Sequence, residues 1–250
     1  MEKLKAVIQY DGTSYCGWQF QPDVPTVQGE FERTLSRIVQ CDTRIHGAGR
    51  TDSGVHAVGQ VAHFSVNWRH DILRLQKGLN SLLPQDISVL NLERATADFH
   101  ARHDSNSKTY VYTILNSSIK SPFHRFFSCH IPQPLDIDLM NLASANIIGT
   151  HDFASFGAPT DGTPSTIRQV FSAQWKHDQE NRLLRFYITG SGFLRYMVRT
   201  IVATLIRVGK GEIAPDHVKI ILESCNRSLA IGKAPACGLC LTQVNYPPGD

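Results

Sequence analysis

No long apolar run interrupts the 250 residues of this sequence. None of its apolar stretches approaches the ~18 residues that a transmembrane helix requires. The first residues, Met1–Lys5, lead into only a short apolar stretch, which does not have the form of a secretory signal. We therefore expect a protein that is not inserted in a membrane.

The chain contains few cysteines, and most of them lie far from one another in the sequence. Of six scattered cysteines, only Cys237 and Cys240 lie close together, a distribution typical of reduced thiols in a cytoplasmic protein. The Cys237-Gly-Leu-Cys240 spacing also occurs in redox and metal motifs. However, no second pair accompanies it, and residues i and i+3 of a strand point to opposite faces. We interpret the pair as structural and leave open whether it has any function.

Nucleotide and metal motifs are also missing. The glycine-rich segment Gly47–Ala57 is not a dinucleotide fingerprint, because its third glycine is misplaced and a strand follows it. It also lacks the Gly-Lys-Ser/Thr ending of a phosphate-binding loop. The spacing of His100 and His103 would bind a metal only on a helix that faces further ligands, whereas this segment is typical of a loop. The sequence therefore predicts no metal and no organic cofactor.

The charge of the chain is modest. With 42% hydrophobic and 19% charged residues the composition is that of an ordinary globular protein, and a net charge of +3 is weak support for a polyanionic partner. Arginine outnumbers lysine 16 to 9, which suits bidentate contacts with phosphate and bases. Ordinary surface arginines explain that excess equally well, so composition alone leaves the partner open.

Hydrophobic periodicity predicts the same order of elements twice. In the first half the expected strand, helix, strand, strand, helix and strand are Lys3–Tyr10, Val27–Val39, Arg44–His46, Val58–Val66, Ile72–Leu82 and Ile87–Leu92. In the second half they are Lys108–Leu115, Asp138–Ile148, Arg168–Trp175, Leu183–Thr189, Phe193–Val208 with a shorter helix near Val218–Leu222, and Leu239–Val244. This is the split βαβ order of ferredoxin-like folds. We predict an α+β protein of two ferredoxin-like (βαββαβ) halves, residues 1–105 and 106–250, whose mixed or antiparallel sheets form a central cleft.

Two long irregular loops, Asp11–Pro25 and Gly157–Ser165, are of the kind that often carries function. Between the second and third strands, the segment Gly47–Ala57 holds Arg50 and Asp52 two positions apart. By itself this segment fits a tight turn, whose aspartate caps backbone amides, at least as well as it fits a catalytic loop.

An ordered series of motifs resembles the TruA-type tRNA pseudouridine synthases. The motifs are Tyr10–Gln19, Arg50–Ala57, Phe99–Arg102, Lys108–Tyr112, His151–Phe156, Thr166–Arg168, Phe193–Arg199 and Gly238–Leu239. They keep the family's order from near the first residue to near the last. The resemblance implies an isomerase that converts uridine to pseudouridine near positions 38–40 of the tRNA anticodon arm. It further implies a homodimer that needs no metal or small-molecule cofactor, since the reaction consumes neither redox equivalents nor energy.

The resemblance also assigns the two charged residues of the glycine-rich segment. Asp52 matches the nucleophile, and a carboxylate can form a covalent adduct and then leave. Whether it attacks the sugar C1′ or uracil C6 stays open. Arg50 matches the arginine that helps to extrude the target base, at an unstacking cost of roughly a few kcal/mol. A surface salt bridge is the alternative for Arg50.

Residues of the second half complete the expected site. Tyr110 matches the tyrosine that stacks on uracil, although both Tyr110 and Tyr112 also suit a buried strand face. Arg199 matches the basic residue that pairs with the aspartate and favours its ionised form. On the expected helix it follows Arg195 by four residues, which places both on one side. Leu239 matches the apolar residue against uracil, with core packing as the alternative.

The residues expected to bind RNA are Arg102, Lys108, Arg168 and Arg195. Lys108 stands where many members carry arginine, which keeps the charge but weakens bidentate contact. For Arg195, a phosphate contact and a solvated surface position are equally good interpretations.

Two other functions are compatible with parts of this sequence. An RNA chaperone would keep the fold without turnover, but the presence of Arg50, Asp52 and Tyr110 together favours an enzyme. A glycoside hydrolase would need a positioned pair of carboxylates, and the matched motifs contain no second acid.

Overall fold

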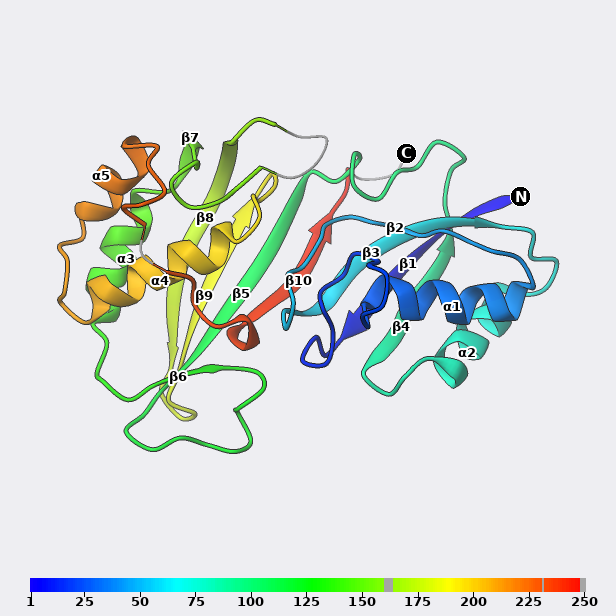
Figure 1. The fold of residues 1–250 in the computed structure, drawn as a ribbon, viewed down its shortest axis with the longest axis horizontal. Coiled ribbons are helices and arrows are strands. Elements are labelled where there is room, and N and C mark those ends of the chain that lie inside the picture. The colour runs from blue at the N-terminus through cyan, green and yellow to red at the C-terminus, as the bar shows by residue number, and fades with distance from the viewer. Residues whose placement is uncertain (160–163, 231, 248–250) are drawn as a thin grey trace. The chain divides into compact units, whose positions relative to one another are not determined.

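The computed structural model describes residues 1–159, 164–230 and 232–247 (Figure 1). The chain divides into two compact units. Unit 1 consists of Met1–Asn106 together with the chain from Leu241 onward, and unit 2 consists of Ser107–Cys240. The sequence predicts a single division after residue 105, whereas the compact units divide after Asn106 and again after Cys240. Each unit is described by itself below.

Unit 1 contains the predicted strand and helix order. Its elements are β1 (Glu2–Tyr10), α1 (Val27–Val39), β2 (His46–Gly47), β3 (His56–Val66), α2 (Ile72–Leu82) and β4 (Ile87–Arg94). β1 lies between β4 and β3, and β2 pairs with β3. All of these pairs are antiparallel. The part of β10 (Leu239–Asn245) that belongs to unit 1 lies on the other side of β3 from β1.

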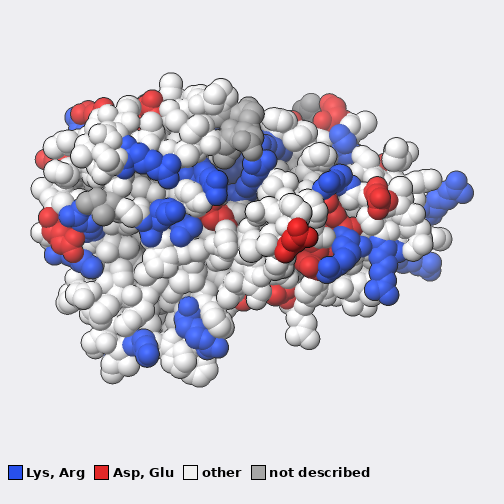
Figure 2. Space-filling view, viewed as in Figure 1, with Lys and Arg blue, Asp and Glu red and all other residues white. Residues whose placement is uncertain are grey.

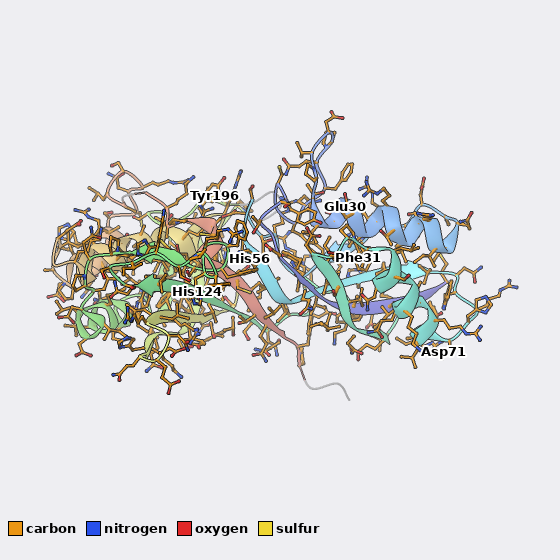
Figure 3. All side chains as sticks on the ribbon, turned by 90° about the horizontal axis from the view of Figure 1, so that it is seen from below. Glu30, Phe31, His56, Asp71, His124 and Tyr196 are labelled. Atoms are coloured by element: carbon orange, nitrogen blue, oxygen red, sulfur yellow. The ribbon has the colours of Figure 1, made fainter. Side chains whose placement is uncertain are left out.

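Local sequence explains these elements. Alternate residues of β1 are buried because successive strand side chains point to opposite faces. Thr26 caps α1, with its Oγ1 accepting the Gly29 N–H at 3.2 Å. Phe31, labelled on α1 in Figure 3, packs against Phe64 of β3 with ring centroids 5.9 Å apart. Burial of a side chain of this size contributes roughly 1.5–3 kcal/mol to folding.

Unit 2 adds two short strands to the predicted order. Its elements are β5 (Ser107–Asn116), β6 (Cys129–Ile131), α3 (Ile137–Ala145), β7 (Gly149–Asp152), β8 (Ile167–Asp178), β9 (Leu183–Gly190), α4 (Met197–Gly209), α5 (His217–Glu223) and a 3₁₀ turn, η1 (Ala236–Gly238), that leads into β10. The strand order is β5-β9-β8-β7 with antiparallel neighbours, and β6 pairs with β5 in parallel. The α+β fold class with mixed strand pairing is thus confirmed. The predicted central cleft stays a prediction.

The start of α4 differs from the prediction. Periodicity predicts a helix from Phe193, but α4 begins at Met197. Tyr196 has a φ of 68°, which interrupts right-handed helical geometry. Arg195 is paired instead with Ala158 through two backbone hydrogen bonds of 3.0 and 3.2 Å. Arg195 and Arg199 are therefore not neighbours on one helix, as the spacing predicts.

Two smaller expectations concern a short strand and a loop. The short strand predicted at Arg44–His46 is β2, which begins two residues later and ends one residue later than predicted. Part of the loop predicted at Gly157–Ser165, residues 160–163, lies outside the described residues.

Across the parts of the chain that are described, each helix is too short or too polar to traverse a bilayer.

Candidate active site

Asp52 lies in a tight turn between β2 and β3. Its backbone carbonyl accepts the Val55 N–H at 3.1 Å, and Gly54 has a φ of 75°, in the left-handed region. Glycine adopts that conformation without a steric penalty, which explains its place in the turn. The Asp52 side chain is half-buried. A turn and a partly accessible carboxylate therefore coexist in one segment.

The loop Asp11–Pro25 packs directly against this turn. The Trp18 N–H donates to the carbonyl of Thr51 at 3.1 Å, and the hydroxyls of Tyr10 and Thr51 lie 2.8 Å apart. A Cβ on Gly17 would lie only 2.6 Å from the Thr51 carbonyl oxygen, and Gly17 has a φ of 96°. The loop and the turn, both of which the sequence marks as functional, therefore pack together as one unit. At Gly17 their backbones approach so closely that only glycine fits.

Tyr15 fixes the far end of the same turn. Its carbonyl accepts from the Gly54 N–H and from the Ser53 hydroxyl, each at 3.2 Å. The Tyr15 hydroxyl donates to Asp86 at 2.5 Å. Burial, and then this carboxylate, raise the pKa of Tyr15 well above its ordinary value, so the phenol stays protonated.

His56, labelled in Figure 3, is the first residue of β3. It is buried, and its Nδ1 lies 3.0 Å from the Gly12 nitrogen and 3.1 Å from a carboxylate oxygen of Asp11. His56 thereby ties β3 to the first residues of the loop Asp11–Pro25. It belongs to the motif Arg50–Ala57, although the motif alone assigns this histidine no role.

Arg50 is exposed, and its Nε donates to the side chain of Gln19 at 3.1 Å. The backbone next to it is held from β3, where the fully buried Gln60 donates to the Gly49 carbonyl at 2.8 Å. The guanidinium is thus accessible on a fixed backbone. This geometry suits a residue that must contact a flexible partner.

Arg102 is joined to the same region through a buried cluster. Ala48, Val61 and Ala101 pack together, so the segment before Arg50 and the segment that carries Arg102 share a core. Arg102 is half-buried. In unit 1 the structure therefore brings Arg50, Asp52 and Arg102 onto connected segments.

In unit 2 the two tyrosines of β5 have different environments. Tyr112 is fully buried and donates to the Pro235 carbonyl at 2.9 Å. Burial raises its pKa far above the ordinary value. Tyr110 is 7% exposed, and its ring meets Phe193 edge-on with centroids 5.2 Å apart. Tyr112 is therefore a structural residue, and Tyr110 stays the predicted site residue.

Three cationic side chains lie close to the ring of Tyr196. The guanidinium carbons of Arg195 and Arg199 lie 4.7 and 5.8 Å from its centroid, and the Lys233 ammonium lies 4.1 Å from it. Arg199 also donates through Nε to the Ala234 carbonyl at 2.8 Å. Tyr196 is labelled in Figure 3, and Figure 2 shows Lys and Arg side chains gathered on the side of unit 2 that carries β9 and α4. The sequence had not singled out Tyr196 or Lys233.

Three predicted residues of unit 2 remain. Lys108 is 7% exposed at the start of β5, and Leu239 is buried at the start of β10. Arg168 is half-buried and donates to the Ser165 and Ile167 carbonyls at 2.8 and 2.6 Å. Their contacts with RNA or uracil stay predictions.

The predicted site residues are thus divided between the units. Arg50, Asp52 and Arg102 belong to unit 1, and the others belong to unit 2. Cys237 lies in η1, with its thiol 3.4 Å from the Ser128 carbonyl, and Cys240 follows in β10. Within the described residues, no group of three or more His, Cys, Asp and Glu side chains is arranged to hold a metal ion.

Comparison with known proteins identifies the class. The family model described as tRNA pseudouridine synthase matches residues 6–104 and 143–247. A protein of Maridesulfovibrio salexigens named tRNA pseudouridine synthase A is 40% identical over 98% of this chain and 91% of its own length. Proteins of that name from Streptococcus agalactiae and Pelobacter propionicus are each 41% identical over 98% of this chain, covering 96% and 100% of their own lengths.

These matches define the class of protein as pseudouridine synthases, which are isomerases. The chain belongs to the tRNA pseudouridine synthase family. The resemblance inferred from the motifs is confirmed.

Proposed function

We propose that the chain converts uridine to pseudouridine in the anticodon arm of tRNA, at positions 38–40, with Asp52 as the nucleophile. The observation that carries the proposal is the half-buried Asp52 carboxylate on a turn that contacts with Tyr10, Tyr15 and Trp18 hold in place. A nucleophile needs such a fixed position, because misplacement by about 1 Å can cost roughly a hundredfold in rate. The names of the relatives supply tRNA as the substrate.

In the proposed reaction the C1′–N1 bond of uridine breaks and a C1′–C5 bond forms. The proton of C5 is lost to solvent, and N1 gains one, so no oxidant, reductant or metal is needed. Asp52 attacks C1′ or C6 and leaves again in the second half of the reaction. A base inside a stacked stem is out of reach, so the target nucleotide must be extruded, and Arg50 is suited to hold it by its phosphate.

Residues of unit 2 have roles in this proposal that rest on the family resemblance. Arg199 keeps the Asp52 carboxylate ionised, Tyr110 stacks on uracil, and Leu239 contacts the ring. Arg102, Lys108, Arg168 and Arg195 bind the RNA. We further propose that two copies of the chain act as a homodimer.

Release of tritium from tRNA labelled at uracil C5 tests the proposal. The protein should release tritium from an unmodified transcript of the anticodon arm, and substitution of the uridines at positions 38–40 should abolish release. Binding of the transcript without release would instead favour an RNA chaperone.

A further inference from the structure

Ala101 is held by side chains at both of its backbone polar groups. Its N–H donates to Nδ1 of His63 at 3.1 Å, and its carbonyl accepts the Tyr246 hydroxyl at 2.7 Å. Ala101 is fully buried, and a buried backbone polar group without a hydrogen-bond partner destabilises the folded state. These two side chains therefore satisfy the only polar groups that Ala101 has.

The two anchoring side chains are themselves fixed. The ring of His63 stacks on His46 at 5.0 Å and meets His100 at 4.6 Å. Because its Nδ1 accepts a hydrogen bond, the proton of the neutral ring must be on Nε2. The Tyr246 ring packs against Phe99 at 5.2 Å, with the Lys5 ammonium 5.0 Å from the centre of the Tyr246 ring.

Arg102 follows Ala101 directly, so the same anchors define where its side chain starts. Its own N–H donates to Nδ1 of His100 at 3.2 Å, and its carbonyl accepts the Ser105 hydroxyl at 3.0 Å. The backbone on both sides of the Arg102 Cα is therefore specified. Because the backbone is held, the direction in which the half-buried side chain projects from it is also fixed. Less conformational entropy is therefore lost when the guanidinium binds a ligand.

We propose that His63 and Tyr246 are positioning residues for tRNA binding: they hydrogen-bond to the N–H and the carbonyl of Ala101 and thereby fix Arg102 where it contacts a tRNA phosphate. This rests on the proposed function, in which Arg102 binds RNA. Neither side chain needs to touch tRNA itself. Their effect on binding passes through Arg102 alone.

The salt dependence of tRNA binding tests this inference. Each phosphate neutralised by a cation contributes about one to the slope of log K against log salt concentration. Arg102→Ala should therefore lower the slope by about one. His63→Leu and Tyr246→Phe remove no positive charge, yet they should lower the slope as well, because the displaced Arg102 no longer neutralises its phosphate.

A second set of variants separates positioning from a general loss of structure. His63→Asn places an amide oxygen near the position of Nδ1 and should restore both the slope and the affinity. In the Arg102→Ala background, His63→Leu and Tyr246→Phe should cause no further loss. His130→Leu is the matched control, since His130 is exposed and its ring hydrogen-bonds with the Ser117 carbonyl, at 2.7 Å in unit 2. It should leave binding unchanged.

Three results would overturn the inference: an unchanged slope in both His63→Leu and Tyr246→Phe, losses that add fully to that of Arg102→Ala, or a slope that Arg102→Ala does not change. If His63→Leu does not fold, Tyr246→Phe carries the test, because it deletes a single hydroxyl. Failure of the proposed function is a separate result. Tritium release would then be absent from the unaltered protein, whatever the binding slopes.

Discussion

The backbone N–H of Trp18 donates to the carbonyl of Thr51 at 3.1 Å, one residue before Asp52. This bond joins two residues that lie more than thirty positions apart in the chain. It places the loop Asp11–Pro25 against the turn that presents the carboxylate. The position of Asp52 therefore depends on residues of both segments.

Gly17 is the point at which this dependence can be tested. Gly17→Ala should push the Thr51 carbonyl away, because the added Cβ would lie 2.6 Å from its oxygen, and a φ of 96° is strained for alanine. We expect a loss of about 1–3 kcal/mol in the free energy of unfolding and a larger proportional loss of turnover. Urea unfolding and tritium release measure the two effects. The control is Gly211→Ala, whose φ of 72° is also positive but whose Cβ would meet no atom within 4 Å. Equal activity losses in both variants would contradict this account.

The two tyrosines of β5 should respond differently to loss of their hydroxyls. Tyr112→Phe removes the hydrogen bond to the Pro235 carbonyl and should cost about 1 kcal/mol of stability, with turnover per folded molecule unchanged. Tyr110→Phe keeps the ring that meets Phe193 and should keep tRNA affinity while lowering the single-turnover rate. A turnover loss confined to Tyr112→Phe would reverse the two assignments.

The sequence predicted those elements whose pattern is local. β1 and α1 follow from alternate and helical burial of residues within each segment, and both were placed to within a residue. The start of α4 could not be predicted, because Arg195 leaves the helical pattern to pair with Ala158, far away in sequence. β6 could not be predicted either, because three residues are too few for a recognisable periodicity.

The candidate site was predictable as a set of residues but not as a structure. The motif around Asp52 is contiguous and could be matched directly. The contact between Gly17 and Thr51, and the anchoring of Ala101 by His63 and Tyr246, arise only when distant segments meet. Periodicity and spacing carry no information on such contacts, so the supporting residues were missed.

His63 should make stability depend on pH. Burial is the largest cause that lowers the pKa of His63 from 6.5 to about 4; the nearby His100, His46 and Lys3 add to the effect of burial, and Asp104 opposes it. The unfolded chain thus takes up a proton at a higher pH than the native protein does, so the contribution of neutral His63 is complete above pH 6.5. The free energy of unfolding should fall as the pH drops from about 6.5 to about 4. Urea unfolding across this range should show a shallower fall for His63→Asn, and identical profiles would contradict the assignment.

Activity should not depend on a metal ion. The proposed bond exchange needs no Lewis acid, and the sequence contains no metal motif. The protein should therefore form pseudouridine at an unchanged rate after dialysis against EDTA. A loss of activity that only an added metal restores would contradict the proposal, provided that the folding of the tRNA is kept constant by monovalent salt.

The central claim is that the Asp52 carboxylate is the nucleophile, and the single-turnover rate of Asp52→Asn on C5-tritiated tRNA tests it most directly. The amide keeps the shape of the side chain but lacks the attacking oxyanion, and loss of a negative charge cannot weaken attraction to phosphate. We predict that tritium release vanishes at every pH while tRNA affinity is kept or increased. Substantial release by Asp52→Asn would contradict the account.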